Sequence, residues 1–146
     1  MASLYQKVMS FQRKYPGSIA FRIRRHCEVV EKHLNEGEEI LFAFAGQKNE
    51  NWYTIINSYV VALTNKRLIL GRKRVLWGYF FSSVTPDLYN DLLVYQGLIW
   101  GKITIDTVKE VIVLSNLSRG SLSSIETSIT EFMMKEKRKY GKTEKN

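Results

Sequence analysis

The chain of 146 residues has the size of one domain and is long enough to bury a core without disulfides or metals. Its 45% hydrophobic and 25% charged residues exclude the disordered, collagenous and coiled-coil classes. The net charge of +8 makes nucleic acid or an anionic membrane surface a partner to test, and the single cysteine, Cys27, excludes an internal disulfide and zinc-ligand spacing.

Two helices are predicted before residue 38. Ser3 and Gln6 have the spacing of a capping box, and apolar residues follow at helical intervals, at Leu4, Val8 and Phe11. The Pro16-Gly17 pair ends this helix. Ser18 is the predicted N-cap of a second helix that runs to Gly37, with an apolar stripe at Ile19, Ile23, Cys27, Val30 and Leu34.

Seven short β-rich runs follow, at residues 40–45, 52–63, 68–70, 77–81, 92–95, 98–105 and 111–114. The turn signals between them are short, which favours antiparallel pairing in a meander. From Ser118 the pattern is helical again, with one apolar face formed by Leu122, Ile125, Ile129, Phe132 and Met133. Residues 141–146 have no apolar content and are expected to fray.

No apolar run approaches the length of a membrane span, and the N-terminus carries charges too early for a signal peptide. We therefore expect a cytoplasmic protein.

Three segments resemble a known family. They are Glu38-Glu-Ile-Leu41, Val61-Ala-Leu-Thr-Asn-Lys-Arg-Leu-Ile-Leu-Gly71 and Gly97-Leu-Ile-Trp-Gly-Lys-Ile-Thr-Ile105. Together they are similar to the bacterial PH-like domain family of the YokE type, and the Leu-Thr-Asn-Lys-Arg-Leu-Ile stretch is the most specific part. The resemblance covers residues 38–134 and implies ring-like self-assembly.

The implied fold class is α+β and mainly β. It is a PH-like antiparallel barrel of about seven strands with a C-terminal capping helix, preceded by two N-terminal helices. Residues 1–37 are then a helical extension and residues 38–146 the PH-like domain, forming one structural unit. Within this fold, Thr64-Asn65 suits a tight hairpin because Asn tolerates positive φ, and Gly101 suits a bulge or bend.

The pattern departs from that of eukaryotic PH domains that bind lipid head groups, in which basic residues surround the first hairpin. Here the first loop, residues 46–51, holds one Lys and one Glu, and residues 52–63 carry no charge. Specific phosphoinositide binding is therefore not expected.

Basic residues flank the third predicted strand. Arg72, Lys73 and Arg74 lie in a predicted turn, and Lys66 and Arg67 lie at the other end of the strand. Loops often carry function, so these five residues form a candidate anion-binding edge. The alternative interpretation is a solvated turn that keeps a sheet edge soluble.

A second candidate surface lies on the second helix, on the face away from the core. Four residues fall within about 60° of one another on the helical wheel: Phe21, Arg25, Glu28 and Lys32. An apolar ring among mixed charges suits a protein partner, although an exposed Phe with ordinary ion pairs explains the same pattern.

No pattern in the sequence indicates a catalytic site. His26 and His33 are two helical turns apart, too far to share a metal, and Cys27 faces the predicted core. Nucleophile-elbow, phosphate-loop and paired-carboxylate motifs are missing. We expect no enzyme, no catalytic residue, no bound metal and no cofactor.

The sequence thus favours a binding or assembly module that forms a homo-oligomer or contacts a protein partner. Its aromatic residues, including Trp52, Trp77 and Trp100, exceed what a small barrel encloses, and aromatic residues are favoured at interfaces. The alternative is peripheral binding to acidic lipid or nucleic acid through basic residues, which predicts binding that weakens steeply with salt.

Overall fold

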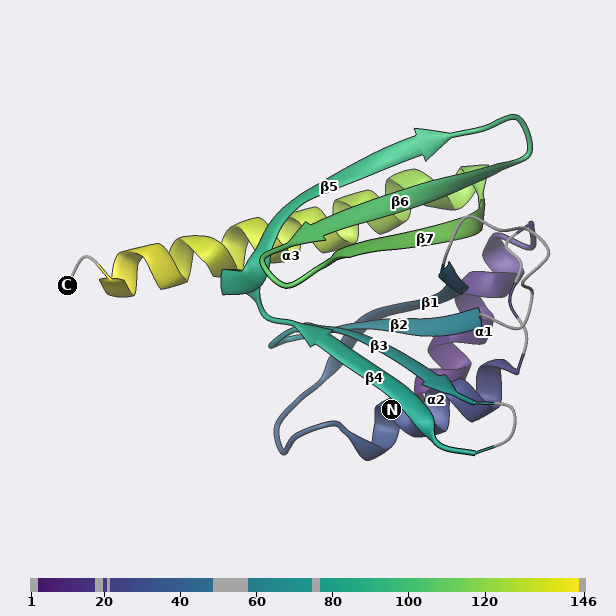
Figure 1. Ribbon diagram of the computed structural model, residues 1–146, viewed down its shortest axis with the longest axis horizontal. Coiled ribbons are helices and arrows are strands. Elements are labelled where there is room, and N and C mark those ends of the chain that lie inside the picture. The colour runs from purple at the N-terminus through teal and green to yellow at the C-terminus, as the bar shows by residue number, and fades with distance from the viewer. Residues whose placement is uncertain (1–2, 18–19, 21, 49–57, 75–76, 145–146) are drawn as a thin grey trace.

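The computed structural model describes residues 3–17, 20, 22–48, 58–74 and 77–144, and the structural statements below concern these residues (Figure 1). Two helices come first, followed by seven strands and a long final helix. In chain order the elements are α1 (Leu4–Lys14), α2 (Ile23–Lys32), β1 (Ile40–Lys48), β2 (Ser58–Thr64), β3 (Leu68–Lys73), β4 (Tyr79–Val84), β5 (Tyr89–Gln96), β6 (Trp100–Thr107), β7 (Val111–Ser118) and α3 (Leu122–Glu144).

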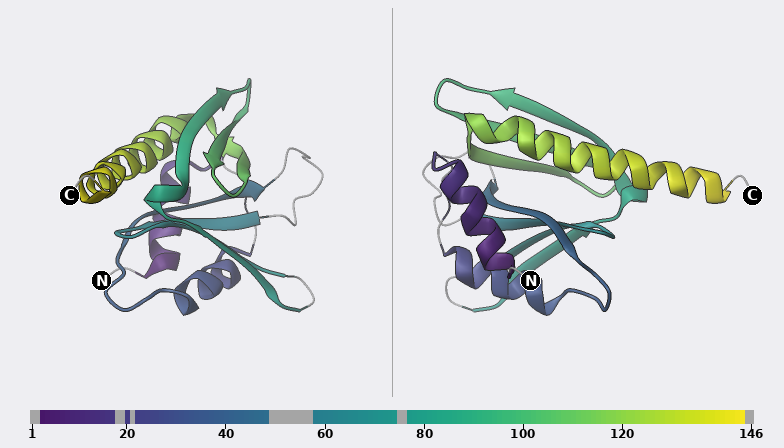
Figure 2. Two further views of the ribbon diagram at one scale, coloured as in Figure 1. Left: turned by 60° about the vertical axis from the view of Figure 1, so that its left-hand side comes forward. Right: turned by 180° about the vertical axis from the view of Figure 1, so that it is seen from behind.

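The seven strands form one antiparallel sheet in the order β4-β3-β2-β1-β7-β6-β5. Two meanders, β1 to β4 and β5 to β7, are joined because the end of β1 pairs with the middle of β7, Gln47 opposite Ser115. The sheet curls at this junction into an open half-barrel, with α3 along the β5–β7 half (Figures 1 and 2). The expected seven-stranded PH-like architecture with one C-terminal and two N-terminal helices is confirmed.

A bulge in β6 lets the sheet curl over α3. The pairing of β6 with β7 changes register between Gly101 and Ile103, as predicted for this glycine. A Cβ atom at Gly101 would lie 2.8 Å from the Tyr95 carbonyl oxygen and would clash with the side chain of Leu122. Glycine is therefore needed here so that the start of α3 can pack closely against the strand.

Both faces of the β1–β3 sheet are buried. Alternate residues of β2, among them Val61 and Leu63, point into the barrel core that α3 closes, while Val60 and Ala62 contribute to a second core under α1 and α2. All seven residues of β2 are consequently buried. This explains why the predicted strand reads as a continuous apolar run rather than an alternating one.

Small residues line the outer side of this sheet. Ala43, Ala45 and Ala62 face α1 and α2, which pack across β1–β3 in the view from behind (Figure 2). At Gly71 α2 packs closely on the sheet, since a Cβ atom there would clash with the side chain of Val30 and lie 3.6 Å from the His26 carbonyl oxygen. The two helices thus pack on the sheet of their own chain. The division of the chain at residue 37 stays a prediction.

The first helix begins as predicted. The Ser3 hydroxyl accepts a hydrogen bond from the Gln6 amide, and the Gln6 side chain accepts one from the Ser3 amide, which completes the capping box. Leu4, Val8 and Phe11 are buried. This helix ends at Lys14, ahead of Pro16-Gly17.

The second helix is shorter than predicted. It begins at Ile23 rather than after Ser18, because Arg22 adopts a left-handed conformation with φ of 58° that cannot lie inside an α-helix. It ends at Lys32, and Gly37, the predicted stop, instead lies in the following loop with φ of 77°. Ser18 and Ile19 lie outside the described residues.

The third helix has the predicted apolar face. Leu122, Ile125, Ile129 and Met133 are buried against the barrel core, and Phe132 packs at its edge. The prediction that residues from 141 onward fray is wrong up to Glu144, because the helix continues to that residue and extends beyond the sheet (Figure 1). The described helices include none that is long and apolar enough to span a membrane.

Candidate functional site

The most specific part of the sequence motif forms an internal clasp. Arg67 donates from Nε to Glu38 Oε2 over 3.0 Å and from Nη2 to Glu38 Oε1 over 3.2 Å. The same guanidinium donates to the His33 carbonyl oxygen and to the Ser83 hydroxyl. One arginine thereby ties together the ends of α2 and β4 and the start of β1.

The pKa of Glu38 reflects this setting. Burial alone would raise the pKa of the carboxyl group, but hydrogen bonds from Arg67, the Asn35 amide and the Thr64 hydroxyl hold it below its ordinary value. The Thr64 hydroxyl is 2.6 Å from Glu38 Oε2 and also accepts bonds from the Lys66 and Arg67 amides. Glu38 is therefore ionised and fully paired.

Asn65 has a different role from the predicted one. Its φ is not positive; instead its side chain accepts a hydrogen bond from the Glu39 amide over 2.9 Å and donates one to the Gly37 carbonyl oxygen over 3.2 Å. The backbone amide of Asn65 donates to the backbone carbonyl oxygen of Glu39. The Thr-Asn-Lys-Arg turn is thus a docking point for the chain that enters β1.

The five residues of the candidate anion-binding edge do not converge. Lys66 is exposed in the β2–β3 turn, while Arg67 is engaged by Glu38. Arg72 lies near the far end of β3 and Arg74 just beyond it, about 20 Å and about 26 Å from Lys66 at the usual rise of a strand. A single small anion cannot contact both ends of the strand.

The far end of β3 is held by its neighbours. The Arg72 guanidinium lies over the Tyr59 ring, 5.7 Å from its centroid. The Lys73 amide donates to Nδ1 of the buried His26, and the Lys73 carbonyl oxygen accepts a bond from Arg22. Arg74 is exposed. The anion-binding role of this cluster stays a prediction.

The candidate protein-interaction face on α2 is partly described. Arg25, Glu28 and Lys32 are exposed on this helix, and Phe21 lies outside the described residues. His26 and Cys27 face the outer core, where burial, reinforced by Glu31, raises the pKa of the Cys27 thiol to about 12. The described His, Cys, Asp and Glu residues include no group of three that could hold a metal ion.

Exposed apolar side chains gather at the two ends of the sheet. In the β5–β6 hairpin Leu93 is 63% and Tyr95 62% exposed, and Leu98 at the tip is 94% exposed. At the other end Trp77, just before β4, is 75% exposed, and Tyr79 in β4 is also exposed. Trp52 lies outside the described residues.

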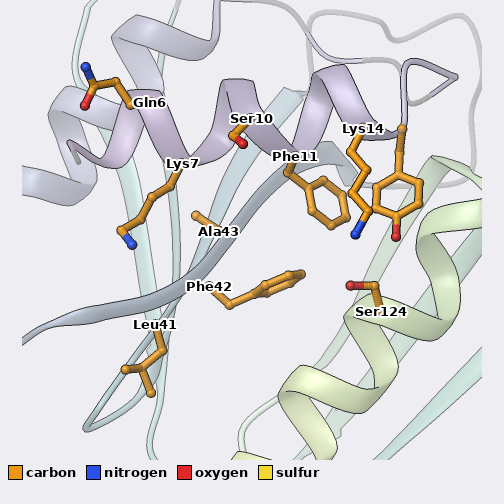
Figure 3. A pocket seen from close by; sticks show the side chains of 10 residues that line it. Gln6, Lys7, Ser10, Phe11, Lys14, Leu41, Phe42, Ala43 and Ser124 are labelled. Atoms are coloured by element: carbon orange, nitrogen blue, oxygen red, sulfur yellow. The ribbon is translucent and has the colours of Figure 1, made fainter. Parts of the chain in front are cut away.

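A hollow of about 340 Å³ lies between α1, β1 and α3 (Figure 3). Its apolar lining is Phe11, Leu41, Phe42 and Ala43, and Lys7 and Lys14 extend from α1 toward it. Ser124 lines the α3 side, and its hydroxyl points into the hollow (Figure 3). The sequence does not predict this site, because its lining comes from three elements that only the fold brings together.

An open antiparallel barrel of seven strands closed by a C-terminal helix defines the PH-like class of domains, which are generally non-catalytic binding modules. The family model for the bacterial PH domain matches residues 34–131, about two thirds of the chain. The chain belongs to this family. No curated protein matches it.

Proposed function

We propose that this bacterial PH domain is a non-enzymatic assembly module whose copies join through the two edges of the open sheet. The observation that carries the proposal is the nature of those edges. Among the described strands, β4 pairs with β3 alone and β5 with β6 alone, so each has one side of its backbone without a strand partner.

The second half of the β5 edge, Leu92–Gln96, carries no charged residue. Edge strands are commonly protected by charged residues, Pro or bulges. In β5, whose sequence is Tyr-Asn-Asp-Leu-Leu-Val-Tyr-Gln, the single charged residue, Asp91, and the bulge both lie at the start of the strand. The exposed side chains of Leu93 and Tyr95 lie beyond it. An apolar edge segment of this kind favours the addition of another strand.

The β4 edge has the same character. The strand from Tyr79 to Val84 contains no charged residue, and Trp77 and Tyr79 expose aromatic surface beside it. Because β4 and β5 differ in sequence, pairing of one with the other joins copies head to tail. A head-to-tail interface closes into a ring when the rotation per copy permits, and otherwise continues as a filament.

The experiment that tests the proposal is absolute mass by light scattering after size exclusion, over a range of concentrations and at low and high salt. Apolar edge pairing predicts a multimer that resists salt, since only exposed charge interactions are strongly screened. A monomer at every concentration contradicts the proposal. A monomer that also binds acidic vesicles or DNA at low salt alone would instead favour the peripheral-binding alternative.

Variants that block one edge of the sheet at a time show which edges pair with each other. Leu93→Lys with Tyr95→Lys should block β5, Tyr79→Lys should block β4, and each variant alone should be a monomer. Val108→Lys is the matched control, because Val108 is 67% exposed but lies in the β6–β7 turn. Head-to-tail pairing predicts that a mixture of the two blocked proteins forms a dimer and nothing larger. A β4-blocked protein that still dimerises by itself would show that β5 pairs with β5.

A further inference from the structure

The hollow between α1, β1 and α3 adjoins a second hollow on the same side of β1. This second hollow of about 330 Å³ shares Leu41 and Phe42 with it and continues between β1 and α3 past Leu63 and Phe132. The two hollows adjoin at Leu41 and Phe42 along the seam between the sheet and the C-terminal helix, and together they are called the groove below.

Charge is distributed unevenly along this groove. The ten residues that line the first hollow include Lys7 and Lys14 and no carboxylate. Within the described residues, neither lysine forms an ion pair. Lys7 also lines a neighbouring hollow with Glu31 and Glu39, whereas Lys14 lies at the other end of α1, away from those acids. Lys14 is thus the cation that can meet an anionic ligand without a competing carboxylate.

Polar donors surround the Lys14 end. Tyr15 and Ser124 line the hollow with Lys14, whose amine lies 5.5 Å from the centroid of the Tyr15 ring. In Figure 3 the amine of Lys14 and the hydroxyl of Ser124 point toward the space beside the Phe42 ring. An ammonium group and hydroxyls can hold a carboxylate through charge-assisted hydrogen bonds.

We propose that the groove binds a fatty acid, with its carboxylate at Lys14 and its alkyl chain over Phe42 toward Phe132. A single alkyl chain has a shape that can extend through both hollows past their shared residues, Leu41 and Phe42. The one negative charge of a fatty acid is complementary to Lys14, since no carboxylate lines that hollow. The farther end carries Glu131 and Lys135 together, so it offers no second anion site. Ligand pockets commonly combine an apolar lining with a few such polar groups.

The chain should contribute most of the affinity. Burial of one methylene group from water raises an association constant about fourfold. Octanoate, decanoate and dodecanoate, titrated calorimetrically into the full chain below micelle formation, should therefore bind with steeply increasing affinity. Dodecyltrimethylammonium has the same chain and the opposite charge, and it should bind much more weakly.

Two pairs of matched variants locate the ligand. Lys14→Gln should weaken dodecanoate binding about tenfold through loss of a charge-assisted bond, while Arg13→Gln, on the same helix outside the groove, should leave it unchanged. Ser124→Phe should block the groove, and Ser123→Phe, on the exposed side of α3, should not.

Three results would overturn the proposal: no binding of dodecanoate, equal binding of the two amphiphiles, or equal effects within either pair of variants. If Ser124→Phe unfolds the protein, the Lys14 and Arg13 pair decides alone. Dodecanoate binding that stays the same in the edge-blocked monomers is expected, since no edge residue lines the groove. The fatty-acid proposal and the assembly proposal can therefore fail separately.

Discussion

Arg67 and Glu38 form a buried ion pair between residues 29 positions apart in the chain. The Glu38 side chain has no solvent exposure and that of Arg67 has 14%. The pair joins the loop before β1 to the turn between β2 and β3. Both charges are satisfied inside the protein, so the motif that marks the family serves the fold.

Arg67→Met should destabilise the protein by about 3–5 kcal/mol, because it leaves the Glu38 carboxylate buried without its partner. The free energy of unfolding in urea measures the loss. Lys66→Met is the matched control: Lys66 is exposed in the same turn, and its loss should change stability by less than about 0.5 kcal/mol. Similar values for the two variants would mean that the clasp contributes little.

The same pair predicts a pH dependence. The pKa of Glu38 is lower in the folded protein than its ordinary value of 4.5, so the unfolded chain takes up this proton first as the pH falls. The stabilisation is complete above pH 4.5 and is lost as the pH falls through the folded pKa. Accordingly, the difference in unfolding free energy between wild type and Glu38→Gln should be constant near neutral pH and shrink in acid. A difference that grows in acid would contradict the prediction.

Gly71→Val should destabilise the protein by about 1–3 kcal/mol, since its side chain would overpack the contact between β3 and α2. Thermal unfolding measures the effect. Val30→Ala removes the side chain that a Cβ atom at position 71 would meet, so adding it to Gly71→Val should restore part of the lost stability. If the two changes are simply additive, the clash does not involve Val30.

Cys27 should be unreactive in the folded protein. Its thiol is buried and its raised pKa, about 12, leaves almost no thiolate at pH 8. Ellman's reagent should therefore label it slowly in buffer and rapidly in urea, with a midpoint that coincides with unfolding by circular dichroism. Rapid labelling in buffer would show that α2 opens from the sheet without global unfolding.

The two halves of α3 should differ in how much they contribute to the stability of the fold. Ile129→Ala removes a fully buried side chain from the barrel core and should cost about 2–5 kcal/mol. Truncation after Lys139 shortens the C-terminal part of α3, which extends beyond the sheet (Figure 1), and should leave the unfolding midpoint in urea almost unchanged. A large loss on truncation would indicate that the extension of α3 holds part of the fold.

Local sequence patterns predicted three features of the fold correctly. The capping box at Ser3, the apolar spacing from Leu122 to Met133 and the bulge at Gly101 all depend on neighbours within a few residues. The start of α2 was mistaken because apolar periodicity continues through Arg22, whose backbone turns left-handed. Periodicity records which face is buried and says nothing of where the backbone conformation changes.

The functional surfaces were harder to predict because they depend on distant contacts. From the sequence alone Arg67 resembles an exposed cation, because its partner Glu38 is distant in the chain. The basic residues of the candidate edge do not form one site, because β3 separates Lys66 from Arg74. The excess of exposed aromatic residues was predicted, and Trp77 and Tyr95 bear it out. The groove could not be predicted, since it requires residues of α1, β1 and α3 to line the same hollow.

The order of the elements along the chain has a consequence for synthesis. The outer faces of β1, β2 and β3 are covered by α1 and α2, which precede them. Because a chain emerges from the ribosome N-terminus first, each of these strands appears when its covering helices are already available. Strands with two apolar faces are prone to aggregate while they wait for partners. In this protein α1 and α2 are synthesised before β1, β2 and β3. The outer faces of these strands are therefore uncovered for as short a time as the order of translation allows.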